Sequence, residues 1–557
     1  MDFGPASNGR AFRLALFKQP NLVTLAPMTT APARVRVAPS PTGDPHVGTA
    51  YMALFNKALA DTTGGQFILR IEDTDRSRYV ADSEAQIFDA LAWLSLTPDE
   101  GPHKGGSCGP YRQSERLPLY KEAANRLISE GKAYKCYCTS DRLETLRKIQ
   151  QAEKAKLLGY DGLCRGLSAE EVAKNDAEAK PCVVRFKMPR EGEIDVRDLF
   201  RGRLTFIAAE QQDTVLLKSD GFPTYHLAMA VDDHAMGITH VIRAEEWIPS
   251  TPLHFELYRA FGWDAPVFAH MPLLRNKDKS KISKRKNPTS LLWYRDAGFL
   301  PEALRNFLGL MGFSLPNDQE IFSYEEFLKH FDLAKVNIGG PIFDLQKLHW
   351  LNGEYIRRLP AAELEKRLVE YAKRMMHRQR EFADLPEDQL PTETFLRDFE
   401  VKRRVRSRVL GGLAPELMTS YEVNPQLLAP IISLIQERMH TLGEAADYLP
   451  MFFTRDFKYT PEDFIQKKGT LEDARNALAA AREMLATSDF EHPEWLQSMD
   501  EQARAKAEAM GLKLGPFLGP VRIAVTGSKV SPPLMESIRV LGKNEALRRI
   551  DAASAAI

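Results

Sequence analysis

The stretch APSPTGDPHVGTAY, residues 38–51, constrains the fold more than any other part of the chain. An apolar segment with strand character precedes it and apolar residues recur at helical spacing after it, which predicts a strand, a tight loop and a helix. Gly43 and Gly48 let the backbone approach a ligand where a Cβ would collide. His46 lies just before the helix, where free N–H groups and the helix dipole favour a phosphate. Taken alone, the stretch fits a nucleotide-binding loop and a tight turn with a capping histidine equally well.

Composition narrows the class of protein. A chain of 557 residues has room for about three or four domains. It carries 75 basic and 75 acidic residues, so any nucleic-acid surface must be a local patch. The five scattered cysteines suit a reducing compartment rather than a disulfide framework. No apolar run approaches the roughly 18 residues that span a bilayer. We therefore expect no membrane partner and a cytoplasmic protein; an organelle matrix is the alternative if residues 1–33 are a presequence rather than a disordered extension.

Polar side chains follow two further predicted strands. The first, at residues 67–71, ends in Glu72, and in open α/β sheets ligands lie beyond the carboxyl ends of the strands. Glu72 could hold a substrate ammonium, or it could belong to a loop that is salt-bridged with neighbouring arginines. The second strand, at residues 240–242, delivers Arg243 and Glu246. Arginine is suited to grip a carboxylate with two parallel hydrogen bonds, unless Arg243 simply pairs with Glu246.

Residues 275–290, RNKDKSKISKRKNPTS, crowd seven basic side chains into a short span. Like charges at this density repel one another unless a polyanion binds them, so the segment alone is typical of a solvated loop. Together with residues 38–51 it becomes a second candidate element for phosphate binding.

The two stretches resemble a pair of known signatures. PHVGT, residues 45–49, resembles the first signature of class I aminoacyl-tRNA synthetases, and KISKR, residues 281–285, resembles the second. The strings LRIEDTDRSRYV, SDGFPTYHLA, THVIRAEEW and NIGGPIFDLQKL are similar to bacterial-type glutamyl-tRNA synthetases, and the likeness covers nearly the whole chain from Arg34. It implies an enzyme that condenses L-glutamate with ATP, which carries Mg²⁺, to glutamyl-adenylate. The enzyme would then pass the acyl group to the terminal adenosine of tRNA(Glu).

The resemblance also implies which residues act on ATP. The catalytic residues would be His46, Lys281 and Lys284. They would orient the triphosphate and stabilise the charge that grows on its oxygens during in-line attack at the α-phosphorus, without a nucleophilic side chain. The implied ATP contacts are His46, Gly48, Glu246, Lys281, Ser283 and Lys284.

The implied glutamate pocket consists of residues at matching positions: Arg36, Ala38, Ser40, Glu72, Tyr225 and Arg243. Arg36 and Tyr225 would face the side-chain carboxylate and Arg243 the α-carboxylate, although the division between the two arginines stays open. Glu72 would face the ammonium. An arginine at the side chain disfavours glutamine, because the neutral amide leaves the guanidinium unpaired at a cost of about 1–3 kcal/mol.

The family's fold would be a multidomain α/β architecture. A Rossmann-like, doubly wound parallel sheet would carry an inserted α/β domain for the acceptor end, followed by a helical stem-contact domain and an all-α anticodon-binding domain. The expected ranges are 1–33 for the extension, 34–110 and 220–275 for the Rossmann-like domain, 111–219 for the insert, 276–358 for the stem-contact domain and 359–557 for the anticodon domain. We expect a monomer.

Cysteines of the predicted insert raise the question of a metal. Some family members bind zinc through a CxC pair and a later CxH. Cys136, Cys138 and Cys164 are present here, but Gly166 replaces the histidine, so zinc is not expected and buried free thiols are favoured.

The helical tail carries two further basic features. The cluster at residues 402–408 is equally typical of a solvated helix face and of a phosphate-contact patch. Arg438, in QERMHTLGEA, matches an arginine that distinguishes glutamate from glutamine anticodons, and arginine can read base edges with two hydrogen bonds. This predicts an enzyme that charges tRNA(Glu) alone. The alternatives are an enzyme that also charges tRNA(Gln) and a non-catalytic tRNA-binding relative, against which the intact His46, Lys281 and Lys284 argue.

Overall fold

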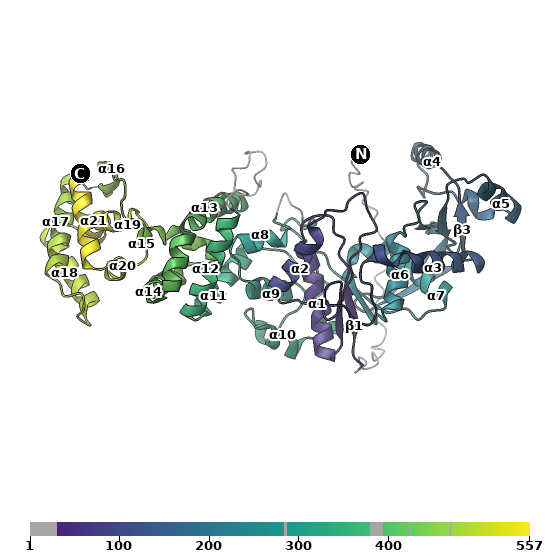
Figure 1. The fold of residues 1–557 in the computed structure, drawn as a ribbon, viewed down its shortest axis with the longest axis horizontal. Coiled ribbons are helices and arrows are strands. Elements are labelled where there is room, and N and C mark those ends of the chain that lie inside the picture. The colour runs from purple at the N-terminus through teal and green to yellow at the C-terminus, as the bar shows by residue number, and fades with distance from the viewer. Residues whose placement is uncertain (1–30, 283–286, 379–393, 424, 468) are drawn as a thin grey trace.

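The computed structural model describes residues 31–282, 287–378, 394–423, 425–467 and 469–557. The strands gather in one half of an elongated molecule, and the described part of the other half is helical (Figure 1). Ser283, Lys284 and nearly all of the predicted N-terminal extension lie outside the described residues.

A parallel sheet forms around the first strand. β1 (Arg34–Val37) pairs in parallel with β2 (Gln66–Leu69), and α1 (Val47–Thr63) connects the two. On the other side of β1, the N–H of Thr239 donates to the carbonyl of Arg34 at 2.9 Å, which places the start of β8 (His240–Ala244) beside the start of β1. The sheet therefore continues through β8.

The chain leaves this sheet in two directions. From β1 it runs through α1 to β2, whereas from β8 it runs through α7 (Thr251–Phe261) to β9 (Val267–Met271) on the opposite side. The gap between the carboxyl ends of β1 and β8 is thus a topological switch point, where open α/β sheets bind ligands. The doubly wound fold expected from the sequence is confirmed.

The outer edge of the sheet is an antiparallel hairpin of β5 (Glu193–Asp198) and β6 (Gly202–Ile207), and β5 joins β9 in parallel. The strand EIDVRD buries alternate residues, Ile194 and Val196, in the core that also contains α7. The hairpin lies inside the range predicted for the inserted domain, yet it pairs with the strands of the nucleotide fold.

The rest of the predicted insert forms its own layer. β3 (Ala133–Cys136), β4 (Val183–Phe186) and β7 (Val215–Leu217) make an antiparallel sheet in the order β3-β4-β7. Its helices are α3 (Leu117–Ser129), α4 (Ser140–Ala152) and α5 (Ala169–Ala177). In Figure 1 this layer lies at the end of the molecule opposite the C-terminus.

Helices extend the core of the nucleotide fold toward the tail. They are α2 (Ser83–Trp93), α8 (Leu291–Asp296), α9 (Pro301–Leu310), α10 (Tyr324–His330) and α11 (Leu345–Arg358). In contrast, α6 (Tyr225–Ala235) lies on the other side of the sheet, where its buried residues share a core with α3 and α7. Buried residues of α8, α9 and α11 share one hydrophobic core with α1, β1 and β2. The predicted stem-contact segment is therefore packed directly on the nucleotide fold.

The tail is helical throughout its described residues. Its helices are α12 (Ala361–His377), α13 (Thr394–Val423), α14 (Pro425–Ile435), α15 (Pro450–Phe453), α16 (Pro461–Phe464), α17 (Leu471–Thr487), α18 (Trp495–Ala509), α19 (Leu514–Thr526), α20 (Leu534–Leu541) and α21 (Lys543–Ala556). Amphipathic spacing explains them: in α12, Leu364, Leu368 and Ala372 recur every four residues and are buried. The tail holds two hydrophobic cores, one around α12 to α14 and one around α17 to α21. No described helix has both the length and the apolar run needed to cross a bilayer.

The basic cluster of α13 contributes to packing. Arg403 and Arg404 both donate to Glu400 at 2.7 Å, and Arg406 pairs with Asp447 at 2.5 Å. All three guanidinium groups are largely shielded from solvent. These three arginines therefore form ion pairs within the folded chain, which neither of the two alternatives from the sequence anticipated.

Candidate active site

A cavity of about 380 Å³ opens at the switch point between β1 and β8. Its lining includes nearly every site residue that the sequence predicted: Arg36, Ala38, Ser40, His46, Gly48, Glu72, Tyr225, Arg243, Glu246 and Lys281. Ser283 and Lys284 lie outside the described residues. The predicted glutamate and ATP contacts that the structure describes therefore converge on one cavity.

The loop before α1 is fixed by the side chain of His46 and by backbone hydrogen bonds to residues 289–291. His46 is the N-cap of α1, and its Nδ1 accepts the N–H of Gly48 at 2.9 Å, which leaves Nε2 as the donor nitrogen of the neutral ring. A Cβ on Gly48 would lie 3.0 Å from that Nδ1, so a glycine suits this position. Val47 N–H donates to Thr289 and Leu291 N–H donates to Pro45, at 2.7 and 2.8 Å. These bonds join the first signature to the segment that follows the second.

Lys281 and Glu246 face each other at the cavity. Nζ of Lys281 lies 2.5 Å from Oε2 of Glu246, and both side chains are about half exposed, at 55% and 45%. The base of the lysine-rich loop is held by Glu245, which bonds Arg275 at 3.0 Å and Arg201 at 2.6 Å. Glu246 thus pairs with the second signature, and the alternative pairing with Arg243 is not observed.

Arg243 is buried among neutral groups. Its Nε donates to Nε2 of His270 at 2.9 Å, and its Nη2 donates to Nδ1 of His254 at 3.1 Å and to Oγ1 of Thr251 at 3.2 Å. Nη1 lies 3.4 Å from the hydroxyl of Tyr225. Only 5% of Arg243 is exposed, and no described carboxylate forms an ion pair with it. Burial accordingly lowers the pKa of this guanidinium. The positive charge of Arg243 therefore lacks a carboxylate partner among the described residues.

Arg36 has the opposite surroundings. Its Nε and Nη2 donate to the two carboxylate oxygens of Asp233 at 3.1 and 3.2 Å, and Arg70 bonds the same carboxylate at 2.7 Å. Burial acts in the other direction, but the charges of Arg36 and Arg70 lower the pKa of Asp233. The charge of Arg36 is therefore compensated, and its Nη1 remains for a ligand.

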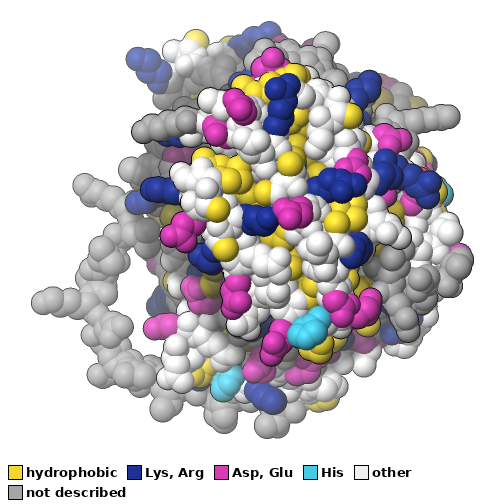
Figure 2. All heavy atoms as spheres, turned by 90° about the vertical axis from the view of Figure 1, so that its left-hand side faces the viewer, with side chains coloured by type: hydrophobic (Ala, Val, Ile, Leu, Met, Phe, Trp, Pro, Cys, Tyr) yellow, Lys and Arg dark blue, Asp and Glu magenta, His cyan; other side chains and the backbone are white. Residues whose placement is uncertain are grey.

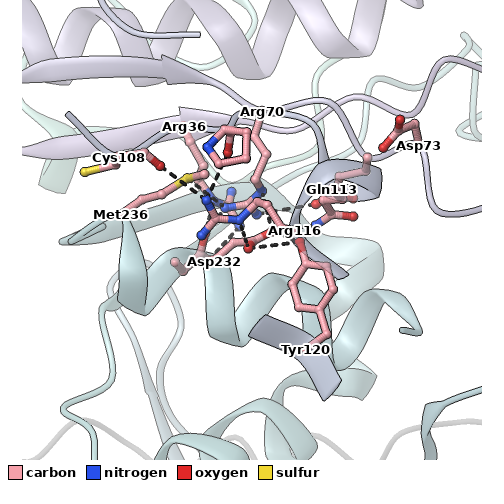
Figure 3. Close-up of polar contacts among 12 residues, drawn as sticks. Arg36, Arg70, Asp73, Cys108, Gln113, Arg116, Tyr120, Asp232 and Met236 are labelled. Atoms are coloured by element: carbon pink, nitrogen blue, oxygen red, sulfur yellow. Dashed lines mark hydrogen bonds and ion pairs between the residues drawn. The ribbon is translucent and has the colours of Figure 1, made fainter. Parts of the chain in front are cut away.

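Arg70, which shares Asp233 with Arg36, continues these ion pairs toward the inserted domain, since its Nε lies 3.6 Å from Oδ2 of Asp232 (Figure 3). Asp232 accepts from Nε of Arg116 at 2.7 Å, from Gln113 at 2.9 Å and from the hydroxyl of Tyr120 at 2.9 Å. Gln113 and Arg116 belong to a short 3₁₀ helix that leads into α3, which carries Tyr120. A buried polar network therefore links the predicted glutamate pocket to the start of the insert.

Glu72 completes the charged lining. Only 8% of it is exposed, and Oε1 lies 3.4 Å from Nη2 of Arg70. Burial raises the pKa of Glu72 to about 7, and Arg70 and Arg36 oppose the rise. A cationic group beside Glu72 would favour its ionised form. Ion pairs of the kind named in the alternative of a salt-bridged loop are also present: besides Glu72 with Arg70, Asp75 pairs with Arg78 at 2.7 Å.

The functional partners missed by the sequence analysis are Asp232, Asp233, His254 and His270. Asp232 and Asp233 form an acidic pair in α6, within a run of buried residues. Such a pair inside an apolar helix needs buried cations, and that signal could have identified it. The two histidines carried no comparable signal, because each is a single residue in an apolar segment.

Away from this cavity, the three cysteines of the insert come together. Sγ of Cys138 lies 3.6 Å from Sγ of Cys164, and the thiols of Cys136, Cys138 and Cys164 all lie within 4.8 Å of one another. Cys136 and Cys164 are buried. The absence of zinc stays a prediction.

Arg438 lies far along the chain from the cavity, at the end of a 3₁₀ helix after α14, and is exposed. Its charge acts on Arg522 of α19, whose pKa is lowered first by burial and then by Arg438. The helical end of the molecule shows basic and acidic side chains interspersed around a strip of apolar ones (Figure 2). Two neighbouring guanidinium groups are thus a local basic feature of the tail.

A doubly wound sheet with a charged cavity at its switch point, two loops suited to phosphate and a helical tail define a nucleotide-dependent enzyme of the class I tRNA synthetase type. The family model for the catalytic domain of class I tRNA synthetases (E and Q) matches residues 32–350, and the model for an anticodon binding domain matches residues 408–554. The chain belongs to the glutamate–tRNA ligase family.

Individual relatives agree over nearly the full length. The glutamate–tRNA ligase of Acidothermus cellulolyticus is 46% identical over 528 residues, which cover 94% of this chain and 95% of the relative. A glutamate–tRNA ligase of Thermus thermophilus is 47% identical over 521 residues, with coverages of 93% and 99%. The crystal structure of a glutamate tRNA ligase from Elizabethkingia meningosepticum in complex with its amino acid superposes with a TM-score of 0.73 at 32% identity and covers 94% of this chain and 99% of that one. The expected family and multidomain fold are confirmed.

Proposed function

We propose that the protein is a glutamate–tRNA ligase. It activates L-glutamate with ATP and Mg²⁺ to glutamyl-adenylate and transfers the acyl group to the 3′-terminal adenosine of tRNA(Glu). The observation that carries this function is Arg243, a buried guanidinium in the cavity whose bonding partners are all neutral. A buried charge of this kind requires an anionic partner, and a substrate carboxylate supplies it.

The charge of the whole pocket supports glutamate over glutamine. Of the two guanidinium groups in the cavity lining, that of Arg36 is paired with Asp233, whereas no described carboxylate forms an ion pair with that of Arg243. One buried positive charge therefore remains. The glutamate zwitterion carries one net negative charge and neutralises the pocket, whereas glutamine is neutral and leaves the charge buried.

In this proposal, glutamate is held through its side-chain carboxylate, its α-carboxylate and its ammonium group. Nη1 of Arg36 and the hydroxyl of Tyr225 hold the side-chain carboxylate, and Arg243 holds the α-carboxylate. Glu72 accepts the ammonium, with Ala38 and Ser40 completing the wall. The α-carboxylate is thereby held for attack on the α-phosphorus, with pyrophosphate as the leaving group.

ATP lies between the two signatures. His46 and the N-terminus of α1, including Gly48, face the phosphates from one side, and Lys281 faces them from the other. Ser283 and Lys284 of the second signature are the remaining proposed phosphate contacts. The phosphates compete with Glu246 for Lys281, whose ion pair is half exposed and contributes only about 0–1 kcal/mol. The lysines stabilise charge on the phosphate oxygens, and no side chain acts as a nucleophile.

Recognition of tRNA is divided along the chain in the proposal. The insert at 111–219 holds the acceptor end, residues 276–358 contact the stem, and the helical tail reads the anticodon through Arg438. Arg522 supports this role, since two neighbouring guanidinium groups form a local basic site. The proposal includes a cytoplasmic monomer, which size-exclusion chromatography of the purified protein would test.

Aminoacylation with separate tRNA(Glu) and tRNA(Gln) transcripts tests the function. We expect glutamate to be attached to tRNA(Glu) alone, and Arg438→Ala to reduce charging of tRNA(Glu) by a factor of about 10 or more, since one base contact is worth roughly 1–3 kcal/mol. Charging of both transcripts would support the ligase activity but refute the role of Arg438. Charging of neither would favour a non-catalytic tRNA-binding protein. Lys284→Ala should abolish adenylate formation while tRNA binding persists.

A further inference from the structure

Two buried chains of imidazoles converge on Arg243. One runs from Asp198 to His270, whose Nδ1 lies 2.6 Å from Oδ2 of Asp198 and whose Nε2 accepts from Nε of the arginine at 2.9 Å. The other runs from His226 to His254, whose Nε2 lies 3.0 Å from Nδ1 of His226 and whose Nδ1 faces Nη2 of the arginine at 3.1 Å. His254 and His270 are both completely buried. The catalytic steps described above use neither of them.

The arginine fixes the state of both rings. A guanidinium only donates hydrogen bonds, so Nε2 of His270 and Nδ1 of His254 must be unprotonated acceptors. The proton of His270 then lies on Nδ1 and is donated to Asp198, and that of His254 lies on Nε2 and is donated to His226. Each ring is confined to one neutral tautomer. Burial and the charge of Arg243 lower the pKa of His254 and reinforce this state.

The only carboxylate in these chains is kept away from the arginine. Oδ1 of Asp198 caps the N–H groups of Phe200 and Arg201, each at 3.0 Å, and Oδ2 also accepts the backbone N–H of His270 at 3.1 Å. An imidazole therefore stands between Asp198 and Arg243. Arg36, in contrast, touches Asp233 directly.

We propose that His254 and His270 are positioning residues for glutamate binding: they hold the Nε and Nη2 edge of Arg243 with neutral acceptors, so that Nη1 faces the cavity with its charge uncompensated. A carboxylate at either position would fix the same orientation but neutralise the charge and compete with the substrate. Neutral acceptors provide the orientation alone. The proposal rests on the proposed function, in which Arg243 binds a glutamate carboxylate.

The test separates orientation from charge. His270→Gln and His254→Asn keep an acceptor oxygen close to the lost nitrogen, whereas His270→Ala and His254→Ala remove it. His254→Asp places a carboxylate against Arg243. His240→Gln is the matched control, because His240 lies at the start of β8, the strand that contains Arg243, and contacts Thr239 rather than the arginine. The readouts are KM for glutamate, KM for ATP, kcat and the melting temperature of the full-length protein.

We expect the alanine variants to raise KM for glutamate at least tenfold with KM for ATP within twofold, and the acceptor-retaining variants to recover most of the loss. His254→Asp should raise KM for glutamate still further although its new ion pair preserves the melting temperature. Equal effects of the acceptor-retaining and alanine variants would overturn the proposal. Should the alanine variants fail to fold, His254→Asp decides alone, and an unchanged KM for glutamate contradicts the proposal. Wild-type protein that charges no glutamate would instead refute the proposed function.

Discussion

Arg36 and Arg243 line the same cavity, but their surroundings are opposite. Arg36 shares Asp233 with Arg70, so its charge is balanced within the folded protein. Arg243 is held by two histidines, a threonine and a tyrosine, so its charge is balanced only when an anion enters. The first arrangement makes the arginine part of the fold as well as of the site. The surroundings of Arg243 lower the stability of the ligand-free protein, because a buried unpaired charge is unfavourable until an anion binds.

Arg243→Met tests the difference between the two arginines most directly, because it keeps an unbranched side chain and removes the charge. We expect kcat/KM for glutamate to fall on the order of 1,000-fold, because the substrate carboxylate loses a buried charged partner worth about 2–5 kcal/mol. The melting temperature should stay level or rise, because an uncompensated buried cation is removed. Steady-state kinetics and thermal unfolding measure both effects. Arg259→Met, on an arginine side chain that is 73% exposed, is the control. A strongly destabilised Arg243→Met protein would contradict the contrast.

Arg36→Met should show the other pattern. Removing one cation from the buried Asp233 pair destabilises the protein by up to about 3–5 kcal/mol, and Arg70 limits the loss because it still bonds Asp233. Chemical denaturation measures this change. KM for glutamate should also rise at least tenfold. The double variant Arg36→Met with Asp233→Asn should regain stability without regaining activity. If the double variant is less stable than the sum of the single variants predicts, the two side chains are not balanced against each other.

The raised pKa of Glu72 predicts how glutamate activation and protein stability depend on pH. Because burial raises its pKa to about 7, the carboxylate that receives the ammonium is mostly protonated below that pH, and kcat/KM for glutamate should fall about tenfold per pH unit there. Protein stability should change with pH in the opposite direction to activity. The folded pKa lies above the ordinary 4.5, so the folded state binds the proton more tightly, and the contribution of Glu72 to the free energy of unfolding falls as pH rises from 4.5 to about 7.

Glu72→Gln is the matched variant for this pH test. It should lose the acid limb of the activity profile and be more stable than the wild type at pH 8, with no such difference at pH 4.5. Denaturation curves at the two pH values check the stability, and initial rates across pH check the activity. An acid limb that persists in Glu72→Gln would assign the titration to another group.

Short-range patterns were sufficient to predict much of the site. Residues 38–51 predict a strand, loop and helix from local spacing, and His46 does cap α1. Arg243 could be placed because it follows the predicted strand at residues 240–242, which the structure extends to Ala244 as β8. The partners that give the two arginines their different states could not be placed, because they are far away in sequence: Asp233 lies 197 residues from Arg36, and His270 lies 27 residues from Arg243 across a helix.

The fold shows the same limit. The sequence analysis assigned residues 193–198 to the inserted domain because they fall within 111–219, whereas the structure pairs this strand with β9 of the nucleotide fold. For the basic cluster of α13, the sequence likewise predicted the positive charge but not the partners of the arginines. Whether those arginines face solvent, phosphate or acidic side chains depends on Glu400 and Asp447, and their contacts form only in the folded chain.

The smallest expected effect concerns the far end of the Arg36 network. Tyr120→Phe removes the hydroxyl that donates to Asp232, while Arg116 and Gln113 still bond that carboxylate, so stability should fall by about 1 kcal/mol. KM for glutamate should change less than threefold, since Asp233 still holds Arg36. Chemical denaturation and glutamate titration measure the two quantities, with Tyr137→Phe, on a tyrosine that bonds Asp176, as control. A tenfold rise in KM would mean that the network transmits the position of α3 to the glutamate pocket. Arg36 would then respond to the inserted domain, whereas the bonding partners of Arg243 are His254, His270, Thr251 and Tyr225.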